Sequence, residues 1–128
     1  MSQTEQHHGQ HGTLSAEISN GIVGIVREYT GRGPTKARTT ITDELVVVVM
    51  GESLLKAEKS LIAAGDPDTV IDTRRKFQAA MRDEFVDLVE ESLDRKVIAF
   101  MSDHHIDPDV AVEVFVLEPV ADQARPEV

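Results

Sequence analysis

ARTTITDELVVVVM, residues 37–50, is the clearest indication of the fold class of this chain of 128 residues. It contains two runs rich in β-branched side chains, ARTTI and LVVVVM, and such runs favour extended strands. Thr42, Asp43 and Glu44 separate the two runs, and a short polar interval of this kind suits a β-hairpin. The stretch therefore predicts two antiparallel strands in the first half of the chain.

A second pair of strands is expected near the C-terminus. The runs KVIAFMS (96–102) and VAVEVFVLE (110–118) are mostly apolar, and the polar segment DHHIDPD (103–109) joins them. In the run 110–118, valine occupies every second position, and this alternation is typical of a strand whose two faces differ. The sequence therefore predicts a second hairpin.

Three further segments carry apolar residues at helical spacing and are predicted to be helices: residues 14–30, 52–64 and 67–93. Gly65 suits the position just after a helix, while Asp66 and Pro67 suit the cap and the first residue of the next one. Gly21 and Gly24 interrupt the first helix, and we expect them to permit close packing against another element.

The predicted order of elements is α-β-β-α-α-β-β, which favours an α+β two-layer sandwich with a four-stranded, mostly antiparallel sheet covered by helices. Runs such as LVVVVM are apolar on both faces of a strand. Helices on one side of the sheet would leave the other side apolar, so we expect a homodimer or a higher oligomer. The alternative is that the first or the third helix crosses to the far face.

Length and composition favour a single domain. We assign residues 13–118 to this domain and the polar, aperiodic segments 1–12 and 119–128 to mobile tails. The chain has no cysteine, and its N-terminus lacks the pattern of a secretory signal, so a cytoplasmic location is expected. A net charge of −10 argues against binding to nucleic acids, which requires many contacts from Lys and Arg to phosphate.

The turn GRGPTKAR, residues 31–38, is basic within this acidic chain. Segment 27–38 contains four basic residues and one acidic residue, a local charge of +3. Glycines can expose backbone N–H groups, and an arginine fork matches oxyanions, so we predict a site for phosphate, carboxylate or bicarbonate at five residues: Gly31, Arg32, Gly33, Lys36 and Arg38. The alternative is an ordinary C-terminal cap of the first helix, formed by Gly31.

The segment SDHHIDPD, residues 102–109, combines imidazole and carboxylate groups, the ligands that zinc and similar ions accept. The candidate metal ligands are Asp103, His104, His105 and Asp107. Neighbouring residues on a strand point to opposite faces, so both histidines reach one ion only if the turn bends between them. The alternative is a polar hairpin turn. The sequence shows no nucleophile motif, and nothing in it indicates that neighbouring carboxylates such as Asp43 and Glu44 share a buried site, which favours a role other than catalysis; it identifies no cofactor.

Three runs of the chain resemble a known bacterial family: EYTGRGPTKARTTITDELVVVVMGESLLKAEKSL, RRKFQAAMRDEFVDLVEE and KVIAFMSDHHIDPDVAVEVFVLE. The family is MpsC, a component of a sodium-translocating, membrane-potential-generating system, and the resemblance covers about residues 14–118. The G-(R/K)-G-P turn at 31–34 and the S-D-H-H-x-D-P-D turn at 102–109 are its most characteristic parts. The resemblance implies a small cytoplasmic partner of a membrane transporter linked to ion gradients and to inorganic-carbon uptake.

The leading hypothesis is therefore an accessory protein that binds a small anion at the basic turn and whose oligomer docks on a membrane partner. One alternative is a metal-dependent enzyme in which His104, His105 and an aspartate hold the ion and a bound water is the nucleophile. Another is a structural oligomerisation module without a ligand.

Overall fold

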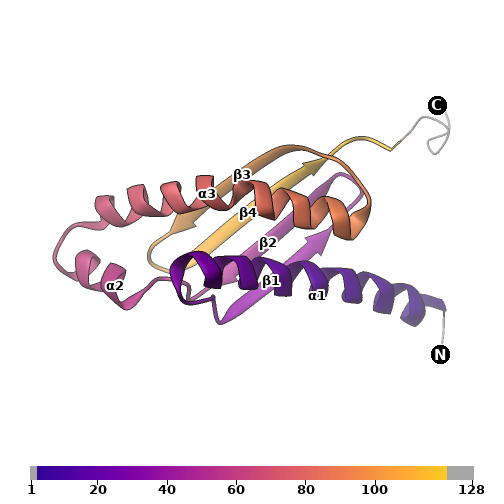
Figure 1. Ribbon diagram of the computed structural model, residues 1–128. Coiled ribbons are helices and arrows are strands. Elements are labelled where there is room, and N and C mark those ends of the chain that lie inside the picture. Colours follow the sequence, from indigo (N-terminus) through magenta and orange to yellow (C-terminus); the bar gives the residue numbers. More distant parts are fainter. Residues whose placement is uncertain (1–2, 121–128) are drawn as a thin grey trace.

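A computed structural model describes the backbone of residues 3–120 and the side chains of residues 12–120 (Figure 1). Its elements are α1 (Gln3–Thr30), β1 (Lys36–Ile41), β2 (Leu45–Gly51), α2 (Lys56–Ala63), α3 (Pro67–Leu93), β3 (Val97–His105) and β4 (Val110–Leu117). This order confirms the predicted α+β class and the α-β-β-α-α-β-β sequence of elements.

The four strands form one antiparallel sheet in the order β1-β2-β4-β3. Both predicted hairpins are present, and the two valine-rich strands β2 and β4 pair at the centre of the sheet. β3 extends beyond its predicted end because His105 still pairs with Val110. The turn between β3 and β4 is therefore reduced to residues 106–109.

The helix boundaries differ from the predicted ones at two places. α1 begins at Gln3, whereas the predicted first helix began at residue 14. α2 begins only at Lys56, since residues 52–55 form a loop. The predicted C-terminal tail, 119–128, lies mostly outside the described residues.

The predicted junction between α2 and α3 is confirmed. Gly65 has a φ of +84°, a left-handed conformation that favours glycine, and it ends α2. The Asp66 side chain accepts a hydrogen bond from the Thr69 N–H at 3.3 Å, and Pro67 is the first residue of α3. This sequence of cap residues lets the chain stop one helix and start the next without an intervening linker.

α1 and α3 lie side by side on one face of the sheet (Figure 1). The core between the layers consists of Ile18, Ile22, Val26, Val46, Val48, Met50, Met81, Phe85, Val89, Ala111, Phe115 and Leu117. A Cβ atom on Gly21 would lie 2.6 Å from Leu88 Cδ2, so this glycine permits the close approach of α1 to α3, as expected. Gly24 has no neighbour within 4 Å of such an atom, so the same expectation was wrong there.

The other face of the sheet carries no helix in the described part of the chain, so neither long helix crosses to it. We call it the open face. Alternation along the strands places the following residues on it: Lys36, Arg38, Thr40, Leu45, Val47, Val49, Ala99, Met101, Asp103, Val110, Val112, Val114 and Val116. None of the described helices combines the length and the apolar character that a membrane span requires.

Candidate functional site

The basic turn (residues 31–38) and the segment SDHHIDPD (residues 102–109), which we call the histidine-bearing turn, lie at the same end of the sheet. Lys36 pairs with Gly51, Gly51 with Val110, and Val110 with His105, so one row of residues crosses all four strands there. The loop of residues 52–55, between β2 and α2, leaves the sheet from this row. The antiparallel topology therefore brings together two turns that are about seventy residues apart in the sequence.

Leu54 connects the two turns through its backbone. Its N–H donates to Asp109 Oδ2 at 2.9 Å, and its carbonyl accepts from Arg32 Nη1 at 2.8 Å. The Glu52 N–H also donates to the Asp109 carbonyl, at 3.1 Å. One loop thus binds a side chain from each turn, and this shared loop gives the charged residues of both turns a structural role.

A buried ion pair holds the other side of the same loop. Arg74, on α3, donates from Nε to Glu58 Oε2 at 2.7 Å and from Nη2 to the Ser53 carbonyl at 2.8 Å. Glu58 Oε1 in turn accepts from the Leu55 N–H at 2.7 Å. Arg74 and Glu58 are 4% and 6% exposed, so this pair is desolvated and both partners depend on these bonds.

The two histidines point in different directions. His104 is buried, and its Nε2 lies 2.8 Å from Asp109 Oδ1, whereas His105 is exposed and its Nδ1 lies 2.9 Å from the Pro108 carbonyl. Burial lowers the pKa of His104, although the hydrogen bond to Asp109 acts in the opposite direction. A neutral His104 donates from Nε2 to the Asp109 carboxylate and thereby positions it toward Leu54.

The four predicted metal ligands do not converge in the structure. Asp103 is exposed, and its Oδ1 accepts from the N–H of His104 at 2.8 Å, while Asp107 is an exposed residue of the turn. Among the described residues, no three His, Asp or Glu side chains are placed to hold one ion. The metal site remains a prediction, which titration with Zn²⁺ or Mn²⁺ would test.

Both glycines of the basic turn serve the packing of α1. Gly31 has a φ of +83°, and its N–H donates to the Arg27 carbonyl at 2.8 Å, so it forms the helix cap that we considered as the alternative. A Cβ atom on Gly33 would lie 3.0 Å from Val23 Cγ1 and 3.3 Å from the Val23 carbonyl oxygen. Gly33 therefore lets the turn fold back against the helix that it has just left.

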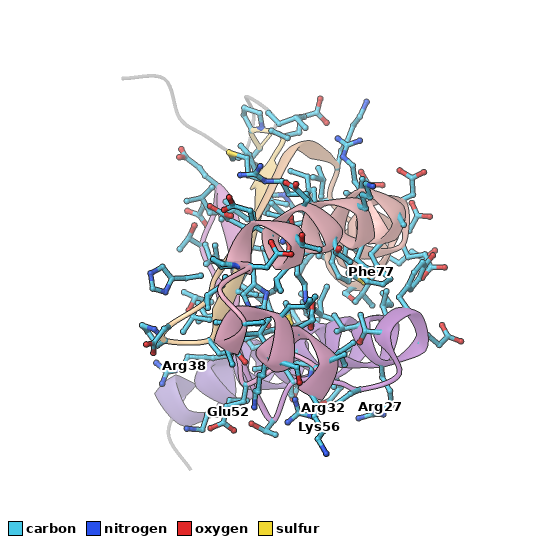
Figure 2. All side chains as sticks on the ribbon, turned by 90° about the vertical axis from the view of Figure 1, so that its left-hand side faces the viewer. Arg27, Arg32, Arg38, Glu52, Lys56 and Phe77 are labelled. Carbon is cyan, nitrogen blue, oxygen red and sulfur yellow. The ribbon has the colours of Figure 1, made fainter. Side chains whose placement is uncertain are left out.

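The basic side chains divide into two groups (Figure 2). Arg27, Arg32 and Lys56, all exposed, gather near the end of α1 and the start of α2, and we call them the basic cluster. A Cβ atom placed on Gly33 would lie 3.5 Å from Arg27 Nε, so Arg27 is next to the basic turn. Arg32 Nη1 donates to the Leu54 carbonyl. Among the described residues, no carboxylate forms an ion pair with any of the three.

Lys36 and Arg38 lie on the open face, apart from the basic cluster. Lys36 forms an exposed ion pair with Glu52 at 3.9 Å, and Glu52 also accepts from the Thr35 hydroxyl. Lys36 and Arg38 line a shallow depression of about 770 Å³ with Thr35, Ala37, Thr40, Val49, Met50, Gly51 and Val110. The five residues predicted to bind one anion are thus distributed over two surfaces.

Glu113 is an acidic residue of the core that the sequence analysis did not single out. It is 2% exposed, and its Oε2 has no hydrogen-bond partner among the described residues. Burial raises the pKa of Glu113 to about 8. The nearby Ser102 hydroxyl acts in the opposite direction, but Ser102 Oγ has no hydrogen-bond partner of good geometry among the described residues. The alternation of β4 contained the signal, because Glu113 shares its face with Ala111, Phe115 and Leu117.

Next to Glu113 lies a cavity of about 20 Å³, which is room for one water molecule. Its polar lining comes from Ser53, Arg74, Gln78, His104 and Glu113. The buried ion pair, the histidine and the core carboxyl group therefore belong to one polar region between the sheet and α3. This region lies inside the fold, so it supports the loop rather than offering a surface to a ligand.

The family model described as Na⁺-translocating membrane potential-generating system (MpsC) matches residues 10–119, most of the chain. A search of curated proteins found no match. A search of solved structures also found none. The matched range includes the basic turn, the loop of residues 52–55 and the histidine-bearing turn.

Proposed function

The chain belongs to the MpsC family, which implies a role in a Na⁺-translocating, membrane-potential-generating system, and we propose that it acts there as a cytoplasmic accessory subunit that binds a small anion. The proposed site is the basic cluster of Arg27, Arg32 and Lys56. A membrane-embedded component of the same system is the partner that we expect to receive this subunit.

One observation carries the proposal: the three cations of the basic cluster lack a carboxylate partner among the described residues, in a chain of net charge −10. Acidic side chains are abundant in this chain, with 23 Asp and Glu against 13 Lys and Arg. A group of three uncompensated cations on such a surface creates a local positive potential that attracts anions.

The arrangement also orients one of the cations. The Leu54 carbonyl, a neutral acceptor, fixes Arg32 through Nη1 and leaves its charge uncompensated. A guanidinium held in this way loses less conformational entropy when an oxyanion binds to its remaining N–H groups. Phosphate, carboxylate and bicarbonate share the paired oxygens that such a fork recognises.

The test is titration of the full chain with sodium phosphate, sodium bicarbonate and sodium acetate at constant ionic strength. We expect calorimetric heats of binding for at least one anion and shifts of the backbone NMR signals of residues 31–33. The double variant Arg27→Gln, Lys56→Gln should raise the Kd roughly a hundredfold or more, since each charged hydrogen bond contributes about 1.5–3 kcal/mol.

The matched control is Arg38→Gln, which removes one cation of the open face and should leave the Kd unchanged. The side chains of Arg27 and Lys56 form no ion pair with another described residue, so the double variant should keep the fold, which its circular dichroism spectrum will show. Backbone signals that stay unchanged up to millimolar anion would rule out the proposed site.

A further inference from the structure

The open face is apolar along its two central strands. β2 and β4 present one leucine and six valines to it: Leu45, Val47, Val49, Val110, Val112, Val114 and Val116. Val49 is 43% exposed and Met101, on β3, is 53% exposed. A contiguous apolar patch of this kind is uncommon on a monomer and marks a surface that binds another macromolecule.

The two edges of the open face carry opposite charges. The strand register places Arg38, Val49, Val112 and Asp103 in one row across β1, β2, β4 and β3. Arg38 forms no ion pair with a carboxylate of the described residues. The face is therefore positive at the β1 edge, apolar in the middle and negative at the β3 edge.

This charge pattern is complementary to itself under one symmetry operation. A two-fold axis that runs along the strands between β2 and β4 exchanges the two edges, so it places Arg38 over Asp103 of the partner subunit. It also places Val49 over Val112 of the partner subunit. A two-fold axis across the strands would instead bring Arg38 close to Arg38 of the partner subunit, which like charges disfavour.

We propose that two copies of this chain pack their open faces together about an axis along the strands and form a sheet-on-sheet homodimer. Two apolar sheet faces packed about 10 Å apart exclude water from the open-face valines of β2 and β4, which we call the valine rows. The same axis places Met101 of the partner subunit over Thr40, at the rim of the 770 Å³ depression.

This dimer goes beyond the proposed anion site and is independent of it. The basic cluster lies near the end of α1 and the start of α2 (Figure 2), whereas the open-face valines lie on the sheet face that these helices do not cover. Anion binding and dimerisation can therefore fail separately, and each has its own variants.

The test is sedimentation equilibrium of the full chain between about 1 and 100 μM. We expect the wild type to reach twice the chain mass of 14.1 kDa within this range. Arg38→Asp and Asp103→Arg should each raise the dimer Kd at least about tenfold, because each places like charges opposite one another. The combined variant Arg38→Asp, Asp103→Arg exchanges the charges of the two edges and should dimerise about as tightly as the wild type.

The matched control is Arg75→Asp, the same charge change at an exposed position of α3, and it should leave the dimer Kd unchanged. A wild type that stays monomeric over the whole range would overturn the proposal and would indicate that the open face binds a different protein instead. A combined variant that dimerises more weakly than either single variant would show that the two edges do not meet.

Discussion

At the scale of single residues, the chain places several ionisable groups inside the fold, and each is accommodated differently. Arg74 and Glu58 neutralise each other, and His104 shares a hydrogen bond with Asp109. Glu113 has no such partner for its Oε2, so burial keeps it in the neutral acid form at pH 7. The first two arrangements hold the 52–55 loop, whereas Glu113 makes the stability of the fold depend on pH.

Replacement of Glu113 by Gln should change this pH dependence. In the wild type the folded-state pKa is about 8, above the value of 4.5 for a free glutamate, so the folded protein binds more protons than the unfolded chain between these two pH values. The free energy of unfolding therefore falls as pH rises through this range, by at most about 1.4 kcal/mol per pH unit. The variant should lack this decrease and gain stability relative to the wild type toward pH 8.

Urea denaturation of the two proteins at pH 5, 6, 7 and 8 measures the effect, and the exposed change Glu91→Gln is the control. His104 has a lowered pKa, so its own contribution to stability rises with pH, the opposite direction. Both proteins contain His104, so the difference between them isolates Glu113. Parallel pH profiles for the wild type and Glu113→Gln would contradict the assignment.

At the scale of elements, the 52–55 loop connects β2 to α2 and contacts α3, the basic turn and the histidine-bearing turn. Its backbone groups bind Arg32, Arg74, Asp109 and Glu58, four charged side chains from different parts of the chain. Most buried backbone N–H and carbonyl groups need a partner, and this short loop finds several of its partners in these side chains, beside backbone bonds such as the one from the Glu52 N–H to the Asp109 carbonyl. The loop therefore fixes how α2 is placed relative to the sheet.

The variant Glu58→Gln should destabilise the fold by about 3–5 kcal/mol, because it leaves the buried Arg74 without its counter-charge. The double variant Glu58→Leu, Arg74→Met replaces the pair by apolar groups and should lose clearly less stability. Thermal and urea unfolding measure both. The exposed pair of Arg75 and Asp72, 4.0 Å apart, provides the control: Asp72→Asn should cost less than about 1 kcal/mol. Equal losses for the single and the double variant would show that the ion pair is not the cause.

At the scale of the whole molecule, the fold has a covered face and an uncovered one. α1 and α3 cover one side of the sheet (Figure 1) and bury the core against it, whereas the other side carries the open-face valines of β2 and β4. A net charge of −10 makes two copies repel each other in general, so their association requires local complementarity. The opposite charges at the two edges of the open face provide it.

The melting temperature of the wild type should rise with protein concentration, by a few degrees for each tenfold increase, because only folded chains form the dimer. The variant Arg38→Asp should show a weaker dependence over the same concentrations. Scanning calorimetry over a hundredfold range of concentration measures both slopes. Melting temperatures that do not change with concentration would contradict the dimer, whereas the anion site at the basic cluster would be unaffected.

Much of the fold could be predicted from local patterns. The β-branched runs at 37–50 gave the first hairpin, and the Gly65-Asp66-Pro67 series gave the end of α2 and the start of α3, because these signals depend only on neighbouring residues. The start of α2 was wrong because Leu54 and Leu55 fit the helical spacing, while Arg32 and Asp109 bind the backbone of Leu54 from elsewhere in the chain. Local propensity carries no information on such distant partners.

The amino-acid sequence alone therefore determined the class of fold, its order of elements, its family and the presence of two unusual turns. The contacts of those turns follow from the folded arrangement: Leu54 joins them, His104 pairs with Asp109, and Lys36 and Arg38 lie on a different surface from Arg32. The physical reason is that strand and helix patterns arise from interactions between near neighbours. A site depends on which distant segments the sheet order β1-β2-β4-β3 brings to the same edge.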